Sequence, residues 1–116
     1  NLGKIVRVFR ANLFPKEKTY FDVIVSNPPY TDHKPKDMVE KSVWDKDHAT
    51  FRKLLKEAPK YLKPKGRMYL SWANFADFKL FEKLAKVNKY NYKKIASLKD
   101  PSDLRIEYRI YELIQK

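Results

Sequence analysis

The stretch of the chain best suited to chemistry is the tetrapeptide Asn27-Pro28-Pro29-Tyr30. An amide side chain stands at its first position and an aromatic ring at its last. The two prolines between them fix their own φ angles, hold the residues before them extended and cannot donate to a β-ladder. The sequence therefore predicts a stiff loop that presents an amide and a ring at fixed positions.

An apolar run, Phe21-Asp22-Val23-Ile24-Val25-Ser26, leads directly into this loop. Its three consecutive β-branched residues are typical of a short strand that is buried on both faces of a parallel sheet. In open α/β sheets, ligands bind just beyond the carboxyl ends of the strands. We therefore expect a binding site at residues 27–30, although a rigid turn with only a structural role would suit the same four residues.

The remaining residues alternate between strand and helix patterns. Residue type and spacing predict strands over 4–10, 66–72, 90–98 and 104–114, and helices over 49–62 and 75–85. Pro59 is expected to loosen the end of the first helix, which Asp45 or Asp47 can cap, and Asn74 to cap the second. Residues 31–46 are expected to form a long polar loop. This order predicts a mixed α/β domain that ends in an antiparallel hairpin.

The sequence of residues 21–30 resembles the Asn-Pro-Pro-Tyr segment of class I S-adenosylmethionine-dependent methyltransferases, in the group that acts on adenine N6 or glutamine N5. The turn Leu62-Lys63-Pro64-Lys65-Gly66-Arg67 is similar to the helix-to-strand turn of that family, with Lys65 where a second glycine is usual. The resemblance covers essentially all 116 residues. It implies the C-terminal half of a Rossmann-like, seven-stranded methyltransferase sheet, mixed in direction, with a terminal antiparallel hairpin.

We accordingly expect residues 1–116 to form a single partial domain whose cofactor-binding N-terminal half is absent. The chain has two glycines, Gly3 and Gly66, and neither can supply the glycine-rich turn that a cofactor of this type needs after the first strand. The site for S-adenosylmethionine would then be incomplete, and the chain alone would be inactive.

The resemblance implies a catalytic role for each residue of the tetrapeptide. The side-chain oxygen of Asn27 and the backbone carbonyl of Pro28 would accept hydrogen bonds from both N–H groups of the target nitrogen. Its lone pair would then point at the sulfonium methyl group, so that catalysis is mostly positioning. Pro29 would hold the carbonyl out of any ladder, and Tyr30 would stack on the planar target. No general base is needed, because the proton leaves after the nitrogen becomes cationic.

Other site residues follow from the same resemblance. Asn12 stands where these enzymes usually carry an Asp that binds the adenine amino group of the cofactor, and Leu13 would present its backbone N–H to an adenine ring nitrogen. An Asn oxygen can accept that bond, and a plain turn residue is the alternative. Trp44 either stacks on the substrate base or, as we favour, anchors its loop to the core. The two histidines, His33 and His48, have no metal-ligand spacing, so we expect them at the surface and expect no metal.

Composition adds information about partners. The formal net charge is +12, from 26 Lys and Arg against 14 Asp and Glu, which favours phosphate-rich partners such as RNA or DNA. Lysines on exposed helix faces are also a common way to solvate a surface. No apolar stretch approaches the roughly 18 residues of a membrane span, and the lack of cysteine fits a cytoplasmic location.

The expected function is transfer of a methyl group from S-adenosylmethionine to an exocyclic amine of adenine or guanine in nucleic acid, or to a glutamine amide of a protein. The alternative is a non-catalytic module, from a truncated or split enzyme, that binds nucleic acid or a partner chain. A partial domain would also expose a sheet edge. We therefore expect self-association through that edge.

Overall fold

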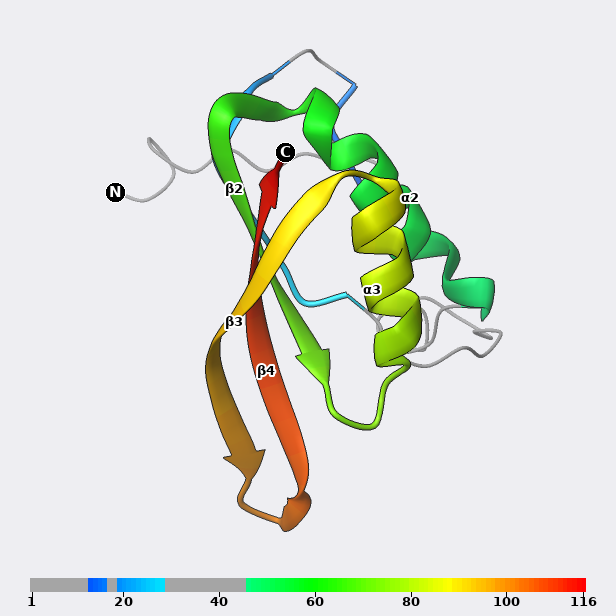
Figure 1. Cartoon of the computed structure of the whole chain (residues 1–116), viewed down its shortest axis with the longest axis vertical. Helices are drawn as coiled ribbons and strands as arrows, with labels where there is room; N and C mark the ends of the chain where they lie inside the picture. The colour runs from blue at the N-terminus through cyan, green and yellow to red at the C-terminus, as the bar shows by residue number, and fades with distance from the viewer. Residues whose placement is uncertain (1–12, 17–18, 29–45) are drawn as a thin grey trace.

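The computed structural model describes residues 13–16, 19–28 and 46–116, which form a mixed sheet with two α-helices on one face (Figure 1). The strands are β1 (Phe21–Ser26), β2 (Leu62–Ala73), β3 (Tyr90–Asp100) and β4 (Asp103–Gln115). The helices are α2 (Ala49–Glu57) and α3 (Phe78–Val87), and two 3-10 helices, η2 (Lys46–His48) and η3 (Ala58–Lys60), flank α2. The sheet order is β1-β2-β4-β3, with β1 and β2 parallel and the other neighbours antiparallel. The predicted mixed α/β class is confirmed.

The core lies between the sheet and the two helices. Residues three or four apart along each helix pack onto every second residue of β2 and β4. The rings in this layer have neighbouring centroids between 4.4 and 6.2 Å apart and belong to Phe51, Trp72, Phe78, Phe81, Tyr92 and Tyr111. The hydroxyl of buried Tyr90 donates to the carbonyl of Leu55 at 2.9 Å, and burial raises the Tyr90 pKa. This bond ties β3 to α2.

The prediction that β1 is buried on both faces was wrong. Ile24 packs against the core, whereas Val23 and Val25 are 50% and 75% exposed. Both helices lie on the same face of the sheet, so no described residue covers the other face over β1. Within the described part of the chain, β1 is also the outer strand, with β2 as its neighbour. A run of β-branched residues predicted the strand but not its surroundings.

The first predicted helix is shorter than its apolar spacing indicated. The α-helix ends at Glu57, and the chain tightens into η3. Pro59 lies in that segment and lacks the N–H that an α-helical turn would use, as expected. His48, in a left-handed conformation, is the N-cap of α2, so the expectation that Asp47 caps the helix was wrong. Asp45 lies outside the described residues.

The strand predicted from Gly66 begins at Leu62, so Pro64 and Gly66 lie within β2 instead of ending a helix. The pairing of β1 with β2 shifts between Phe21↔Leu62 and Val23↔Arg67, and residues 63–66 bulge out of the ladder there. A bulge of this kind accepts a proline and a glycine that a regular central strand would not.

The cap of α3 is Asp77, not Asn74 as predicted. The Asp77 side chain accepts a hydrogen bond from a first-turn backbone N–H at 3.0 Å. Asn74 instead joins the end of β2 to β4, since its Nδ2 donates to the carbonyl of Arg105 at 2.8 Å and its Oδ1 accepts from the N–H of Glu107 at 3.0 Å. Phe75, predicted on the buried stripe of this helix, lies in the turn before it and is 58% exposed.

The terminal hairpin agrees with the prediction to within two residues at each end. β2 pairs with β4 as far as Ala73↔Tyr108, while β3 and β4 stay paired to Asp100↔Asp103. The hairpin therefore reaches beyond the carboxyl end of β2 (Figure 1). The predicted strand over 4–10 and the predicted loop, except for Lys46, lie outside the described residues.

Candidate functional site

Asn27 directly follows β1 and lies exposed at the carboxyl edge of the sheet. The register Ser26↔Leu70 places it beside Ser71 of β2, and the Ser71 hydroxyl donates a hydrogen bond to Asn27 Oδ1. The next residue, Pro28, is buried. The amide of Asn27 therefore faces solvent, whereas the ring of Pro28 is buried.

A pocket of about 270 Å³ lies beside this amide. Apart from Asn27 and Ser71, its lining consists of Val25, Ser26, Tyr69, Leu70 and Ile110. Val25 lines the pocket and points away from the face of the neighbouring Ile24, which packs against the core. The pocket therefore opens on the sheet face opposite the helices. Apolar walls with a few fixed polar groups are the usual form of a small-molecule site.

Three strands position the pocket. Because β1 and β2 are parallel, their carboxyl ends meet at one edge of the sheet, where α/β folds bind ligands. β4 is antiparallel to β2 and brings Ile110 opposite Ser71. Asn27 and Pro28 thus directly follow a paired strand, which holds the Asn27 backbone in place.

A charged cluster lies on the same sheet face, next to the pocket. The hydroxyl of Tyr69 donates to Oε2 of buried Glu112 at 2.9 Å, and Nη1 of Arg67 donates to the same oxygen at 3.0 Å. Nζ of Lys93 lies 3.8 Å from the other carboxylate oxygen. The Tyr69 hydroxyl, and after it the Arg67 guanidinium, hold the pKa of Glu112 below its ordinary value against the effect of burial. The carboxylate in turn fixes the Tyr69 ring beside the pocket.

The structure describes some of the predicted site residues and not others. Asn27 and Pro28 occupy the predicted edge of the sheet. Leu13 has a positive φ of 79°, an uncommon conformation for a leucine, and the neighbouring Phe14 ring stacks on Tyr61 at 4.5 Å. The predicted site residues outside the described part of the chain are Asn12, Pro29, Tyr30 and Trp44.

The expectation of a surface position was wrong for His48, which is 9% exposed. Its ring centroid lies 6.5 Å from that of Trp72, and no described residue hydrogen-bonds to its Nδ1. The backbone at this residue is left-handed (φ 54°) where the chain enters α2, and the imidazole lies beside the buried Trp72 ring. His33 lies outside the described residues.

Sequence reasoning missed Ser71 and Tyr69 as members of the site. The alternation within the predicted strand over 66–72 puts both side chains on one face. The missing information was the register between two strands about 40 residues apart, since that pairing brings Ser71 to Asn27. No sequence signal within either strand supplies it.

No group of three or more His, Asp or Glu side chains within the described residues could hold a metal ion. None of the helices in the described ranges is long and apolar enough to span a membrane. The pocket itself offers the neutral amide of Asn27 beside apolar walls.

The model of the methyltransferase small domain family matches residues 1–94. Among solved structures, the chain is similar to a crystal structure of a methyltransferase from Pyrococcus furiosus, with 23% sequence identity and a TM-score of 0.53. The match covers 86% of this chain and 44% of that one, so the chain spans less than half the length of that protein. No curated protein sequence matches the chain.

Proposed function

Because the chain belongs to the methyltransferase small domain family, we propose that it binds the methyl acceptor in an S-adenosylmethionine-dependent N-methyltransferase. The acceptor in this proposal is an exocyclic amine of a nucleic-acid base or a glutamine amide. The observation that carries the proposal is the Asn27 carboxamide, which lies exposed at the edge of an apolar pocket and is held by Ser71. Amines and amides of this kind are flat, neutral groups with two N–H donors.

The side chains of the pocket explain how such a nitrogen would be positioned. S-adenosylmethionine supplies an electrophilic methyl group, so the protein has mainly to orient the attacking lone pair. Oδ1 of Asn27 and the carbonyl of Pro28 accept the two N–H groups, which draws the lone pair out of conjugation and toward the methyl group. An amide oxygen has two lone pairs, so Asn27 can accept from Ser71 and from the target together.

The chemistry of the lining fits both the acceptor and the cofactor. The described residues around the pocket are uncharged, which suits the vicinity of a cationic sulfonium. Val25 and Ile110 give the pocket apolar walls against which a flat base or amide can pack. Stacking by Tyr30 or Trp44 and cofactor contacts by Asn12 and Leu13 belong to the same proposal and rest on the family resemblance.

An acceptor assay tests this function. It uses the full-length protein, by which we mean the complete methyltransferase that this proposal takes the chain to belong to. The protein is incubated with methyl-labelled S-adenosylmethionine and, in separate reactions, with single-stranded RNA, single-stranded DNA and a glutamine-containing peptide. Mass spectrometry of the digested products then locates the label. We expect it on an exocyclic nitrogen of a base or on a glutamine amide. Label on carbon or oxygen atoms only, or no transfer despite bound cofactor, would contradict the proposal.

A non-catalytic binding module is the second candidate. The observation that favours it is the open sheet face over β1, which leaves Val23 and Val25 exposed and available to a partner chain. Calorimetric titration of the full-length protein with S-adenosylmethionine separates the two. Binding supports the enzyme, while the module predicts no binding of the cofactor.

A further inference from the structure

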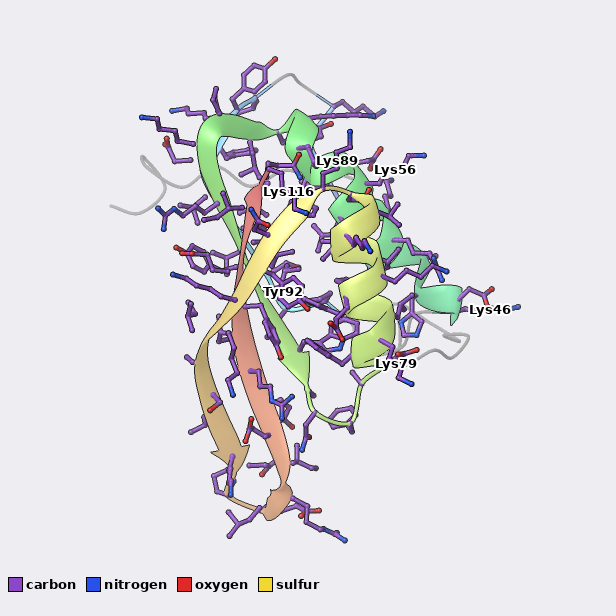
Figure 2. The ribbon with its side chains drawn as sticks, in the orientation of Figure 1. Lys46, Lys56, Lys79, Lys89, Tyr92 and Lys116 are labelled. Atoms are coloured by element: carbon purple, nitrogen blue, oxygen red, sulfur yellow. The ribbon has the colours of Figure 1, made fainter. Side chains whose placement is uncertain are left out.

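The positive charge of the described residues is concentrated on the helix layer, by which we mean residues 46–60 and 77–89 together with Lys116. This layer has ten cationic and four acidic side chains, so it supplies half of the net charge of +12. Lys46, Lys56 and Lys79 project from the helix side, and Lys89 and Lys116 lie together where α3 leads into β3 (Figure 2). The Lys116 N–H donates to the Lys89 carbonyl at 2.9 Å, which confirms that these two residues are neighbours.

The cations of the sheet are mostly neutralised by local partners, whereas those of the helix layer are not. Salt bridges on the sheet join Lys63 to Asp22, Arg67 and Lys93 to Glu112, Arg105 to Asp103, and Arg109 to Glu107. In the helix layer, the corresponding pair is Lys53 with Glu57 at 3.9 Å. No other cation of that layer forms a salt bridge with a described residue. Apart from Lys53, the cations of this layer are therefore not neutralised by salt bridges to the described acidic residues.

The lysines of α3 are regularly placed. Lys79, Lys83 and Lys86 stand at positions i, i+4 and i+7, which share one helix face, and all three are exposed. On α2, Arg52 and Lys56 are four residues apart and likewise exposed. Two neighbouring helices therefore each carry exposed cations at helical spacing, a pattern suited to a polyanion.

An exposed aromatic ring lies at the site end of this layer. Phe75 is 58% exposed in the turn between β2 and α3. β2 is parallel to β1, so this turn and Asn27 lie at the same edge of the sheet. Proteins that bind single-stranded nucleic acid combine a basic surface that follows the backbone with aromatic rings on which bases stack. An acidic protein would match the charge but would give the ring no particular role.

We infer that the helix layer and Phe75 bind single-stranded nucleic acid, with its phosphates on the lysines of α3 and α2 and a base stacked on Phe75. This inference rests on the proposed function and selects nucleic acid as the macromolecule that carries the methyl acceptor. The strand would run from the helix layer over the carboxyl edge of the sheet, where the pocket receives the target base. Methylation of a base requires it to be unpaired or flipped out, which a single strand satisfies.

Fluorescence anisotropy with labelled single-stranded RNA and DNA of the same mixed sequence tests the inference. The test variant is Lys79→Gln/Lys83→Gln/Lys86→Gln, since glutamine keeps the helix propensity of lysine. Each phosphate contact contributes about 0.7 to the salt slope of single-strand binding. We therefore expect weaker binding and a slope of log K against log salt that is about 2 smaller in magnitude. The RNA and DNA titrations show which nucleic acid is preferred.

The matched control is Lys65→Gln/Lys94→Gln/Lys99→Gln, which removes the same charge from exposed positions on the sheet. We expect its slope to stay near that of the unsubstituted chain, and circular dichroism melts verify that both variants are folded. Equal weakening by the two triple variants would overturn the inference, because net charge alone would then explain binding. No binding of either oligonucleotide by the unsubstituted chain would overturn it as well.

The contribution of Phe75 is measured separately. Phe75→Ala should weaken binding about tenfold with little change in the salt slope, and a circular dichroism melt verifies that the variant is folded. Phe75→Tyr should bind like the unsubstituted protein. Unchanged affinity in Phe75→Ala, or competition by polyglutamate as strong as that by RNA, would overturn the inference. These titrations contain no methyl donor, so they test nucleic-acid binding separately from methyl transfer. If the chain does not bind nucleic acid, methyl transfer to a glutamine amide remains open. If the acceptor assay detects no methyl transfer, the binding titrations can still be interpreted.

Discussion

Ser71 lies on β2 and Asn27 directly follows the neighbouring β1, and their contact decides how the amide faces the pocket. The serine hydroxyl donates to Asn27 Oδ1 on the open face of the sheet. If Ser71 positions that oxygen for the methyl acceptor, its loss should affect turnover more than binding. The residue would act through Asn27, without touching the reacting atoms itself.

We predict that Ser71→Ala in the full-length enzyme lowers kcat about five- to tenfold, the cost of one hydrogen bond. KM for the acceptor and the Kd of the cofactor should stay the same. Ser71→Thr keeps the hydroxyl on a strand that tolerates β-branched residues, so it should restore most of kcat. A kcat for Ser71→Ala equal to that of the wild type would rule out this positioning role.

Gly66 provides a second prediction at the level of single residues. A Cβ at this position would lie 3.0 Å from the carbonyl oxygen of Lys63 and 3.1 Å from that of Phe21. Backbone atoms cannot give way easily, so Gly66→Ala should lower the free energy of unfolding by about 1–2 kcal/mol. Urea denaturation measures this, with the exposed neighbour Lys65→Ala as the control. A Gly66→Ala protein as stable as Lys65→Ala would show that the bulge in β2 has room.

Sequence reasoning placed some residues of the site and not others, for a physical reason. The chain order of a strand followed by two prolines was enough to put Asn27 at an exposed edge. It could not identify Ser71 or Tyr69, because their role depends on the pairing of β1 with β2 and on residues far away in the sequence. His48 was misplaced for the same reason, since the core that buries it is formed by elements from the whole chain.

At the level of secondary structure, the pairing of β2 with β4 brings Arg67, Tyr69 and Glu112 together. The pKa of Glu112 is lowered, so its ionised form is favoured in the folded state. This contribution to stability is complete above the ordinary pKa of 4.5 and is lost as the pH falls through the lowered, folded-state value. The pH dependence of unfolding therefore reports on this contact between strands.

We predict that Glu112→Gln is less stable than the wild type at pH 7 and that the difference shrinks as the pH falls below 4.5. The measurement is urea denaturation of both proteins across this range. The pKa values of Asp100, Asp103 and Glu107 are also lowered, each by its own hydrogen-bond partners, and these residues are present in both proteins. The difference between the two curves therefore isolates Glu112. A difference that is independent of pH would contradict this account.

The ends of helices and strands were predicted well where neighbouring residues in the sequence determine them. They were predicted poorly where contacts with distant residues determine them. The turn of the terminal hairpin is fixed by Pro101 and by Asp100, whose side chain accepts bonds from the N–H and the hydroxyl of Ser102 at 2.8 and 2.7 Å. The cap of α3 was misassigned because Asn74 and Asp77 are both good N-caps. Hydrogen bonds between Asn74 and β4, which are long-range, decide between them.

At the scale of the whole molecule, the described helices cover one face of the sheet, and no described residue covers the other face over β1. Parallel strands are normally covered on both faces, yet Val25 is 75% exposed and β1 is the outer strand among the described residues. Apolar residues on an outer strand favour pairing with another chain. We propose that copies of this chain associate through β1 and the face beside it.

Sedimentation velocity over a range of concentrations tests this association. We expect the unsubstituted chain to associate as its concentration rises, and Val25→Lys to remain monomeric because it places a charge in the contact. Val87→Lys is the control, since Val87 is similarly exposed at the end of α3, on the helix side. A monomer at every concentration, or equal effects of the two substitutions, would refute the proposed contact.

The mixed α/β class and the order of the described elements followed from the sequence, because hydrophobic periodicity reports on each element separately. The identity of the covered face did not follow, since it depends on where both helices pack. The charge of +12 was likewise evident from composition. The sequence did not show that this charge is concentrated on the helix layer. That follows from the salt bridges that neutralise many of the cations of the sheet.

The central claim is that Asn27 accepts a hydrogen bond from the nitrogen that is methylated. Its most direct test is the single-turnover rate of methyl transfer by Asn27→Ala in the full-length enzyme, at saturating cofactor and acceptor. The account predicts a fall of about a hundredfold or more, as for other preorganised hydrogen-bond partners of a reacting group, with unchanged affinity for the cofactor. A rate equal to that of the wild type would contradict it.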